Sequence, residues 1–169
     1  MVKPLIIRCE THPFHVTSRT DDSKFFPVPM EEVWEVMLQE LHLLHLNHAL
    51  NVHAFVLMGN HFHLLCLTPK GNLDEIMQRF LSETSHRLKI KWEPRYKWSL
   101  IDSQTHYFQV YRYILQNPIR AGICKRVEEY RFTTLKDQRI PNYSLVAMSF
   151  GGTEGELRWL NEKDAIFHD

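Results

Sequence analysis

Apolar residues follow two periodicities along the chain, and their order predicts its secondary structure. A spacing of three or four, typical of one helix face, occurs over residues 29–46 and again over 72–88. A third helix is expected to begin near Ser103 and to end at Asn117, because Pro118 disfavours helical geometry in the residue before it. Short apolar or alternating runs, typical of strands, occupy residues 5–8, 14–19, 54–58, 61–68 and 92–100.

This order of elements, β-α-β-β-α-β-α, predicts an α+β fold. A ferredoxin-like antiparallel sheet with helices packed on one face accommodates the first six elements. The last helix is then an additional C-terminal helix, which carries Tyr113. With 169 residues we expect a single domain over residues 1–130. Residues 131–169 are a weakly patterned C-terminal extension, with a glycine-rich flexible turn at 151–155 and an acidic tail.

The composition of the chain argues against several classes of protein. The 20 basic and 20 acidic side chains balance, which argues against a histone-like or polybasic protein. Cys9, Cys66 and Cys124 are widely spaced without a Cys-x-x-Cys, so neither a disulfide framework nor a zinc knuckle is supported. No apolar stretch approaches the ~18 residues of a membrane span, and the N-terminus shows no signal peptide. We therefore expect a cytoplasmic protein.

The sharpest candidate for chemistry is Asn60-His61-Phe62-His63, at the start of an expected strand. Because side chains alternate across a strand, His61 and His63 share one face and Phe62 takes the other. Two imidazoles side by side on a rigid strand can hold a divalent metal. The alternative is a pair of surface or hydrogen-bonded histidines, since the chain contains 11 histidines.

A second candidate lies in the third expected helix, where Tyr113 and Asn117 are four residues apart and share a face. Such a tyrosine can offer a nucleophilic phenol, and the amide one turn away a third oxygen ligand to the same metal. The structural alternative is that the tyrosine packs the helix onto a sheet and that Asn117-Pro118 ends the helix.

Basic residues are concentrated in the second half of the chain. Residues 79–126 contain ten basic and three acidic side chains, a net charge of +7 that the rest of the chain balances. Aromatic and basic residues interleave there, a combination that can stack bases and screen phosphates. The alternative is that the tryptophans are core residues and the lysines a solvated surface. The candidate DNA-binding residues are Arg95, Lys97, Trp98 and Arg120, with Arg19 on the first strand.

The two motifs together carry a family resemblance. The His61-Phe62-His63 motif, followed about fifty residues later by Tyr113 and by Asn117-Pro-Ile-Arg120, resembles the single-tyrosine HUH transposases of bacterial insertion sequences. It is most similar to the REP-associated tyrosine transposases. Similar blocks extend from about residue 13 to residue 125. Gly59 departs from the pattern, because relatives usually place proline before the Asn-His pair; this affects the turn and not the ligands.

The resemblance implies a metal-dependent enzyme that nicks and rejoins single-stranded, hairpin-forming DNA. His61, His63 and Asn117 would hold Mg²⁺ or Mn²⁺ against the scissile phosphate. Tyr113 would attack, leaving a 5′-phosphotyrosine and a free 3′-hydroxyl. Of these residues Asn117 is the least determined ligand, since water or an acidic residue can complete a metal site. Relatives of this kind occur as homodimers and as monomers.

Two other functions fit the same residues. A DNA-binding regulator of this fold would not use its nuclease centre, and a small metal hydrolase would use His61 and His63 with water, leaving Tyr113 dispensable. Metal binding requires unprotonated imidazoles, so we expect activity to fade as the pH falls through about 6.5, the ordinary pKa of histidine.

Overall fold

The computed structural model describes residues 8–162, and its centre is a four-stranded antiparallel sheet in the order β2-β3-β1-β4. The strands are β1 (Phe14–Arg19), β2 (Asn51–Leu57), β3 (His61–Leu67) and β4 (Lys97–Leu100). This strand order is the ferredoxin-like one. The predicted fold class is therefore confirmed. None of the helices within these residues combines the length and apolarity that crossing a membrane requires.

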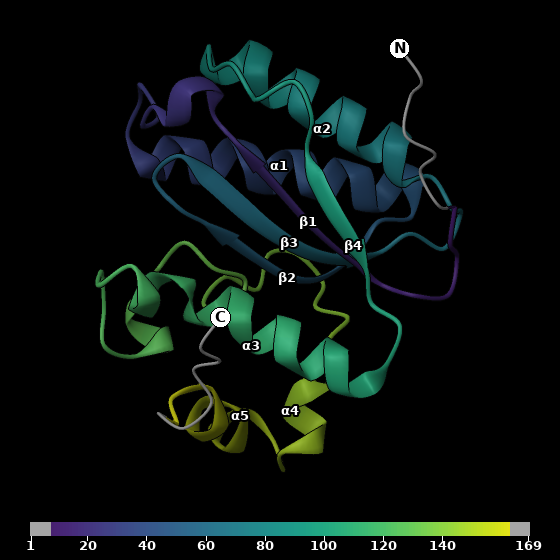
Figure 1. Cartoon of the computed structure of the whole chain (residues 1–169), viewed down its shortest axis with the longest axis vertical. Helices are drawn as coiled ribbons and strands as arrows, with labels where there is room; N and C mark the ends of the chain where they lie inside the picture. The colour runs from purple at the N-terminus through teal and green to yellow at the C-terminus, as the bar shows by residue number, and fades with distance from the viewer. Residues whose placement is uncertain (1–7, 163–169) are drawn as a thin grey trace.

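The helices divide between the two faces of the sheet. Helices α1 (Met30–His48) and α2 (Leu73–Leu88) cover one face, and α3 (Gln104–Arg120) lies against the other (Figure 1). Strand alternation explains this arrangement. On β3, Phe62 packs edge-on against Phe80 of α2 with ring centroids 5.4 Å apart, whereas the neighbouring His63 faces Tyr113 of α3. The sheet thus has an apolar face and a face that carries polar side chains.

Three predicted boundaries were wrong. Strand β2 begins at Asn51 and not at Ala54. Helix α3 continues past Asn117 to Arg120, with Pro118 inside it. A proline removes a single helix hydrogen bond, and the backbone bond from the Ala121 N–H to the Asn117 carbonyl, 3.0 Å, holds the last turn. The strand expected over 92–100 is confined to β4, and Trp92 makes only an isolated bridge to Thr20. The strand expected over 5–8 lies almost entirely outside the described residues.

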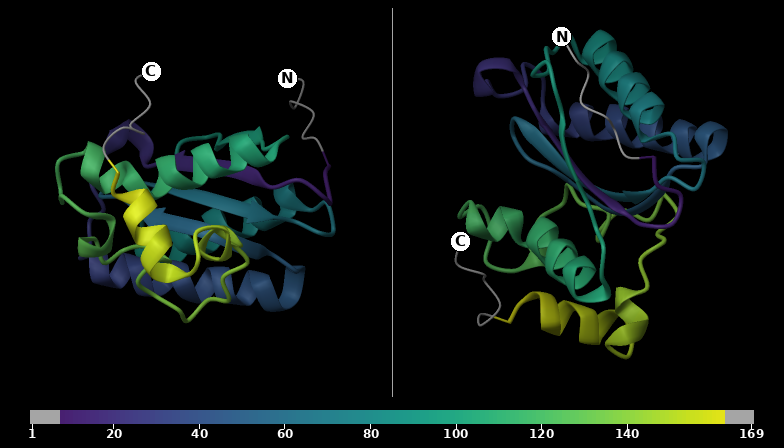
Figure 2. Two further views of the ribbon diagram at one scale, coloured as in Figure 1. Left: turned by 90° about the horizontal axis from the view of Figure 1, so that it is seen from below. Right: turned by 45° about the vertical axis from the view of Figure 1, so that its right-hand side comes forward.

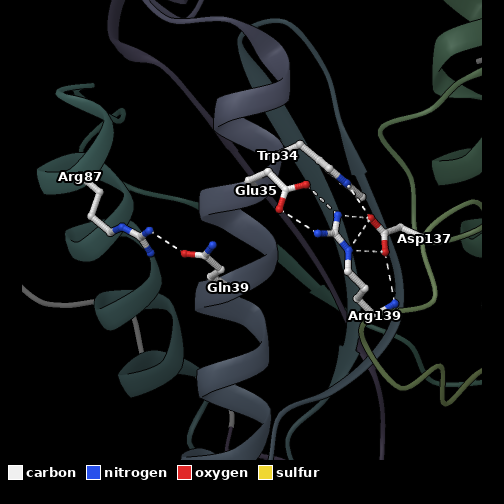
Figure 3. A network of polar contacts seen from close by, with 6 residues as sticks. All are labelled: Trp34, Glu35, Gln39, Arg87, Asp137 and Arg139. Atoms are coloured by element: carbon white, nitrogen blue, oxygen red, sulfur yellow. Dashed lines mark hydrogen bonds and ion pairs between the residues drawn. The ribbon is translucent and has the colours of Figure 1, made fainter.

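Residues after 130 are bound to the sheet and to α1. Thr133 pairs with Val56 at the β2 edge of the sheet. Figure 3 shows Arg139 between Glu35 of α1 and Asp137, with its Nη1 atom 2.7 Å from a Glu35 carboxylate oxygen. The Trp34 ring is buried, and its indole N–H donates a hydrogen bond to the Asp137 carboxylate at 3.0 Å. These bonds fasten residues 131–140 to α1 and to β2.

Two short helices, α4 (Val146–Ser149) and α5 (Thr153–Leu160), follow, and Figure 2 shows α5 on the side of α3 that faces away from the sheet. Gly151 and Gly152 have φ of 76° and 110°, as the expected turn requires. Gly155 is instead helical: a Cβ atom there would lie 1.8 Å from the Phe150 carbonyl oxygen, so only glycine lets the two segments approach this closely.

The contact between α3 and α5 contains buried polar bonds beside the packing of Trp159 on Phe108. The Tyr111 hydroxyl donates to the Glu156 carboxylate at 2.5 Å, and the Gln116 side chain donates to the Leu160 carbonyl at 2.7 Å. Burial and the adjacent Glu156 carboxylate raise the pKa of Tyr111 well above its ordinary value, so the phenol keeps its proton. Tyr111 therefore serves the packing of α5 on α3.

We expect Tyr111→Phe to lower the free energy of unfolding by about 2–3 kcal/mol, because it leaves the buried Glu156 carboxylate without its donor. Urea unfolding followed by circular dichroism measures this. The double variant Tyr111→Phe with Glu156→Leu removes both partners and should recover much of the loss. Equal stability of Tyr111→Phe and the wild type would contradict the buried contact.

Candidate active site

A cleft of about 510 Å³ opens between α3 and the end of the sheet at which the two central strands meet, where β1 ends and β3 begins. It brings together most of the residues that the sequence singled out, from both halves of the chain. They are Arg19, His61, His63, Lys97, Tyr113, Asn117 and Arg120, with Thr17, Ser18, Met58, Glu93 and Ala121 completing the walls.

The pairing of β1 with β3 sets the floor of the cleft. Thr17 lies opposite His63 and Arg19 opposite His61, on the face that α3 covers. His15, two residues earlier on β1, therefore shares that face. The imidazoles of His61 and His63 stand next to each other, with ring centroids 5.2 Å apart, as strand alternation predicts. His63 is only 6% exposed, whereas His61 is half-buried at the rim.

Each of the two histidines is held through the same ring nitrogen. The Nδ1 atom of His61 lies 2.8 Å from Asn60 Oδ1, and Nδ1 of His63 lies 3.0 Å from Nε2 of His15. Asn60 Oδ1 also accepts from Arg19 Nη1 at 3.4 Å. In both rings Nδ1 is thus engaged in a hydrogen bond to a side chain, and Nε2 is the nitrogen left to bind a ligand.

Helix α3 forms the opposite wall. The Tyr113 ring is half-buried and meets the His63 ring edge to face at 90°, with centroids 5.7 Å apart. The Arg120 guanidinium lies over the Tyr113 ring, 5.0 Å from its centroid. Asn117 donates through Nδ2 to the Tyr113 carbonyl at 3.0 Å, and its side chain also contacts His63. A single chain therefore places the Tyr113 ring against His63 and in the same cleft as His61.

The donor set suits a divalent cation through neutral ligands. Within residues 8–162, no group of three or more His, Cys, Asp or Glu side chains is arranged to hold a metal ion. A site here would instead use the two free imidazole nitrogens and the amide oxygen of Asn117. The amide oxygen is a ligand that Mn²⁺ and Mg²⁺ accept, whereas imidazole binds transition-metal ions more readily, so of the two ions Mn²⁺ suits this donor set better. Neutral ligands leave the cation its full charge for a phosphate.

Burial changes the pH at which the histidines protonate. It lowers the pKa of His61 to about 4, with a smaller effect from the Arg19 charge. Burial lowers the pKa of His63 further, to about 3, assisted by the neighbouring His15, His61 and Arg19. The expectation of a transition near 6.5 rested on an exposed imidazole, and in this cleft the transition moves to lower pH.

We expect both histidines of the metal-free protein to remain neutral at pH 5 and to protonate only towards pH 4 and below. A lowered pKa means that the lone pair needed by a metal persists to lower pH, so metal binding should not weaken between pH 6.5 and 5. Histidine ¹⁵N chemical shifts, followed during an acid titration, report each ring separately. Midpoints near 6.5 for His61 and His63 would contradict the buried arrangement.

Two predicted DNA-binding residues lie away from the cleft. Trp98 is on β4 opposite Val16, so its side chain takes the face covered by α1 and α2, and it packs edge-on against the buried Phe14 at 5.8 Å. Trp98 is half-buried and packs against the core from that face, and its role in DNA binding stays a prediction. Arg95 is exposed and precedes β4, outside the cleft. Cys66 is fully buried on the face opposite the histidines, as strand alternation predicts.

Sequence reasoning missed one acidic residue of the cleft and the hydrogen bonds that hold the two histidines, although His15, like Arg19, could be expected near the site from its place on the first strand. The Glu93 N–H donates to the Arg19 carbonyl at 2.8 Å, and this backbone bond carries Glu93 into the cleft wall. No pattern in the sequence around Glu93 predicts that backbone hydrogen bond. For His15 a signal existed, because it alternates with Thr17 and Arg19 on a predicted strand, but the pairing partner of that strand was not specified.

Comparison with known proteins adds evidence on the fold. No family model matches the chain, and no curated protein matches it. Among solved structures, a REP-associated tyrosine transposase bound to a REP hairpin superposes with a TM-score of 0.70, at 17% identity over 79% of this chain and 82% of that one. The chain has the fold of a REP-associated tyrosine transposase. The predicted resemblance to the HUH-type tyrosine transposases is thus confirmed at the level of the fold. A candidate transposase from Deinococcus radiodurans R1 also matches, at 17% identity over 68% of this chain and 94% of that one, with a TM-score of 0.46.

Proposed function

We propose that the protein is a single-tyrosine transposase that nicks and rejoins single-stranded DNA through a 5′-phosphotyrosine intermediate. The observation that carries the proposal is the approach of Tyr113 to the His61 and His63 pair inside one cleft. A phenol, two imidazoles with a free nitrogen each, and cationic side chains are the parts that phosphoryl transfer to tyrosine needs. A DNA-binding module has no use for this combination.

His61, His63 and Asn117 would hold Mg²⁺ or Mn²⁺, which when bound supplies charge stabilisation to the phosphate under attack. Tyr113 Oη forms a bond to phosphorus while the bond from phosphorus to the 3′ oxygen breaks. The proton lost by the phenol ends on the departing 3′-hydroxyl, and the 5′-phosphate stays on Tyr113. Rejoining reverses these changes with a 3′-hydroxyl as the nucleophile, so the energy of the phosphodiester bond is conserved.

The charged walls of the cleft support a nucleic-acid substrate. Arg19, Lys97 and Arg120 surround the tyrosine, against one carboxylate, Glu93. The Arg120 guanidinium beside the Tyr113 ring places positive charge where negative charge builds up on the phosphate. The neighbour of the same fold was solved bound to a REP hairpin. We therefore propose hairpin-forming DNA with an adjacent single strand as the substrate.

The test is incubation of the protein with labelled hairpin DNA carrying a single-stranded flank, in the presence of Mn²⁺. We expect a protein–DNA adduct that survives denaturing electrophoresis, together with a free 3′-hydroxyl on the released strand. Cleavage without an adduct would favour a metal hydrolase that uses water, and binding without cleavage would favour a regulator of the same fold. Either outcome overturns the proposal.

A further inference from the structure

We propose that His15 is a positioning residue for the metal site: it accepts the His63 Nδ1–H and thereby presents the His63 Nε2 lone pair to the cleft. This role rests on the proposed function, in which Nε2 of His63 is a metal ligand. His15 has no place in the ligand set or in the nucleophilic step, yet it lies at their centre, with its ring 6.1 Å from Tyr113 and hydrogen-bonded to His63.

The geometry of the two rings is that of a direct nitrogen-to-nitrogen hydrogen bond. Nε2 of His15 and Nδ1 of His63 are 3.0 Å apart. The ring planes differ by only 26°, and the centroid separation of 5.3 Å is what two nearly coplanar rings meeting end to end produce. Strand pairing fixes this approach, because β1 and β3 are adjacent and both side chains point towards α3.

Asn60 shows what such a partner does for the other histidine. Its Nδ2 donates to the Ser23 carbonyl at 2.8 Å, so its Oδ1 must be the atom facing His61, and an amide oxygen can only accept. His61 therefore carries its proton on Nδ1, and its Nε2 holds a lone pair. Asn60 thus settles the tautomer of His61 without ambiguity.

For His63 the partner is a second imidazole, and two arrangements of the bridging proton exist. If His15 donated, His63 would carry its own proton on Nε2 and could not bind a cation from the cleft. If His63 donates, His15 is the Nδ1–H tautomer and His63 Nε2 is free. Ligating histidines in proteins are oriented in this second way, by a hydrogen bond at the other ring nitrogen. In the metal-free chain the Asn117 side chain also contacts His63, so the second arrangement is the one that a bound cation selects, and His15 is then the acceptor for His63 as Asn60 is for His61.

Two variants of matched size separate orientation from simple packing. His15→Phe keeps a ring in the space but offers no acceptor, whereas His15→Gln keeps an acceptor oxygen. We expect His15→Phe to weaken Mn²⁺ binding by about 10–100-fold and His15→Gln to restore most of it. Mn²⁺ binding is measured by electron paramagnetic resonance of the free ion, with urea unfolding to verify that both variants fold. Equal Mn²⁺ binding by His15→Phe and the wild type overturns the proposal.

The tautomer itself provides a readout that does not depend on activity. In the Mg²⁺-loaded wild type, long-range ¹H–¹⁵N spectra should show His63 protonated on Nδ1, and His15→Phe should shift it towards a mixture. A Mg²⁺-loaded wild type in which His63 is protonated on Nε2 overturns the role of His15. This measurement tests the role of His15 independently of DNA cleavage. Absence of an adduct in the cleavage assay, by contrast, counts against the proposed function alone.

Discussion

Tyr113→Phe should abolish the covalent protein–DNA adduct and lower strand cleavage by about a thousandfold or more, because it removes the only atom that can form the phosphotyrosine bond. DNA binding should change little, since the ring that Arg120 and His63 contact is retained. Both are measured on labelled hairpin DNA with Mn²⁺, the adduct by denaturing electrophoresis and binding by fluorescence anisotropy.

The matched control is Tyr107→Phe, the same chemical change six residues earlier on α3. The Tyr107 hydroxyl lies 2.6 Å from His53 Nδ1 and lines a different cavity, at the N-terminal end of the helix. The Tyr107→Phe substitution should therefore leave adduct formation at the wild-type level. Tyr111→Phe is unsuitable as a control because it disturbs the buried Glu156. Cleavage that survives in Tyr113→Phe would assign the chemistry to water and contradict the nucleophilic role.

Local pattern was sufficient for the fold and for much of the cleft. Strand alternation placed His61 with His63 and away from Cys66, and helical spacing placed Tyr113 with Asn117. Both inferences depend on geometry within one element, which the sequence determines directly. The contact between this face of α3 and this face of β3 is long-range in sequence. The family resemblance predicted it, since spacing within each element cannot specify which faces pack together.

Long-range packing accounts for the parts that were not foreseen. Arg112 counts towards the positive charge of residues 79–126, but it is 5% exposed and donates to the Glu162 carbonyl, so its charge faces α5 and not the cleft. The net charge of a segment does not show which of its basic side chains face the cleft and which face another helix. Likewise α5 binds α3 partly through the buried polar contacts of Tyr111, Gln116 and Glu156, beside the packing of Trp159 on Phe108, and such polar contacts leave no hydrophobic periodicity to detect.

Removal of the metal should have an effect of similar size to loss of the nucleophile. We expect chelation with EDTA, or the substitution His61→Ala, to lower cleavage by about a hundredfold to a thousandfold, because the charge on the attacked phosphate is then no longer compensated. Excess Mn²⁺ should restore the chelated wild type. His61 is the better position to substitute, since it is half-buried at the rim, whereas His63 is buried beneath it.

His42→Ala provides the matched control, because His42 is exposed on α1, across the sheet from the cleft. It should bind Mn²⁺ and cleave DNA as the wild type does. The expected difference between the two alanine variants follows from position alone: one imidazole is oriented by Asn60 towards Tyr113 and Asn117, and the other faces solvent. Cleavage that resists EDTA would mean that Arg19, Lys97 and Arg120 compensate the phosphate charge without a metal, and the two imidazoles would then act only in orienting the strand.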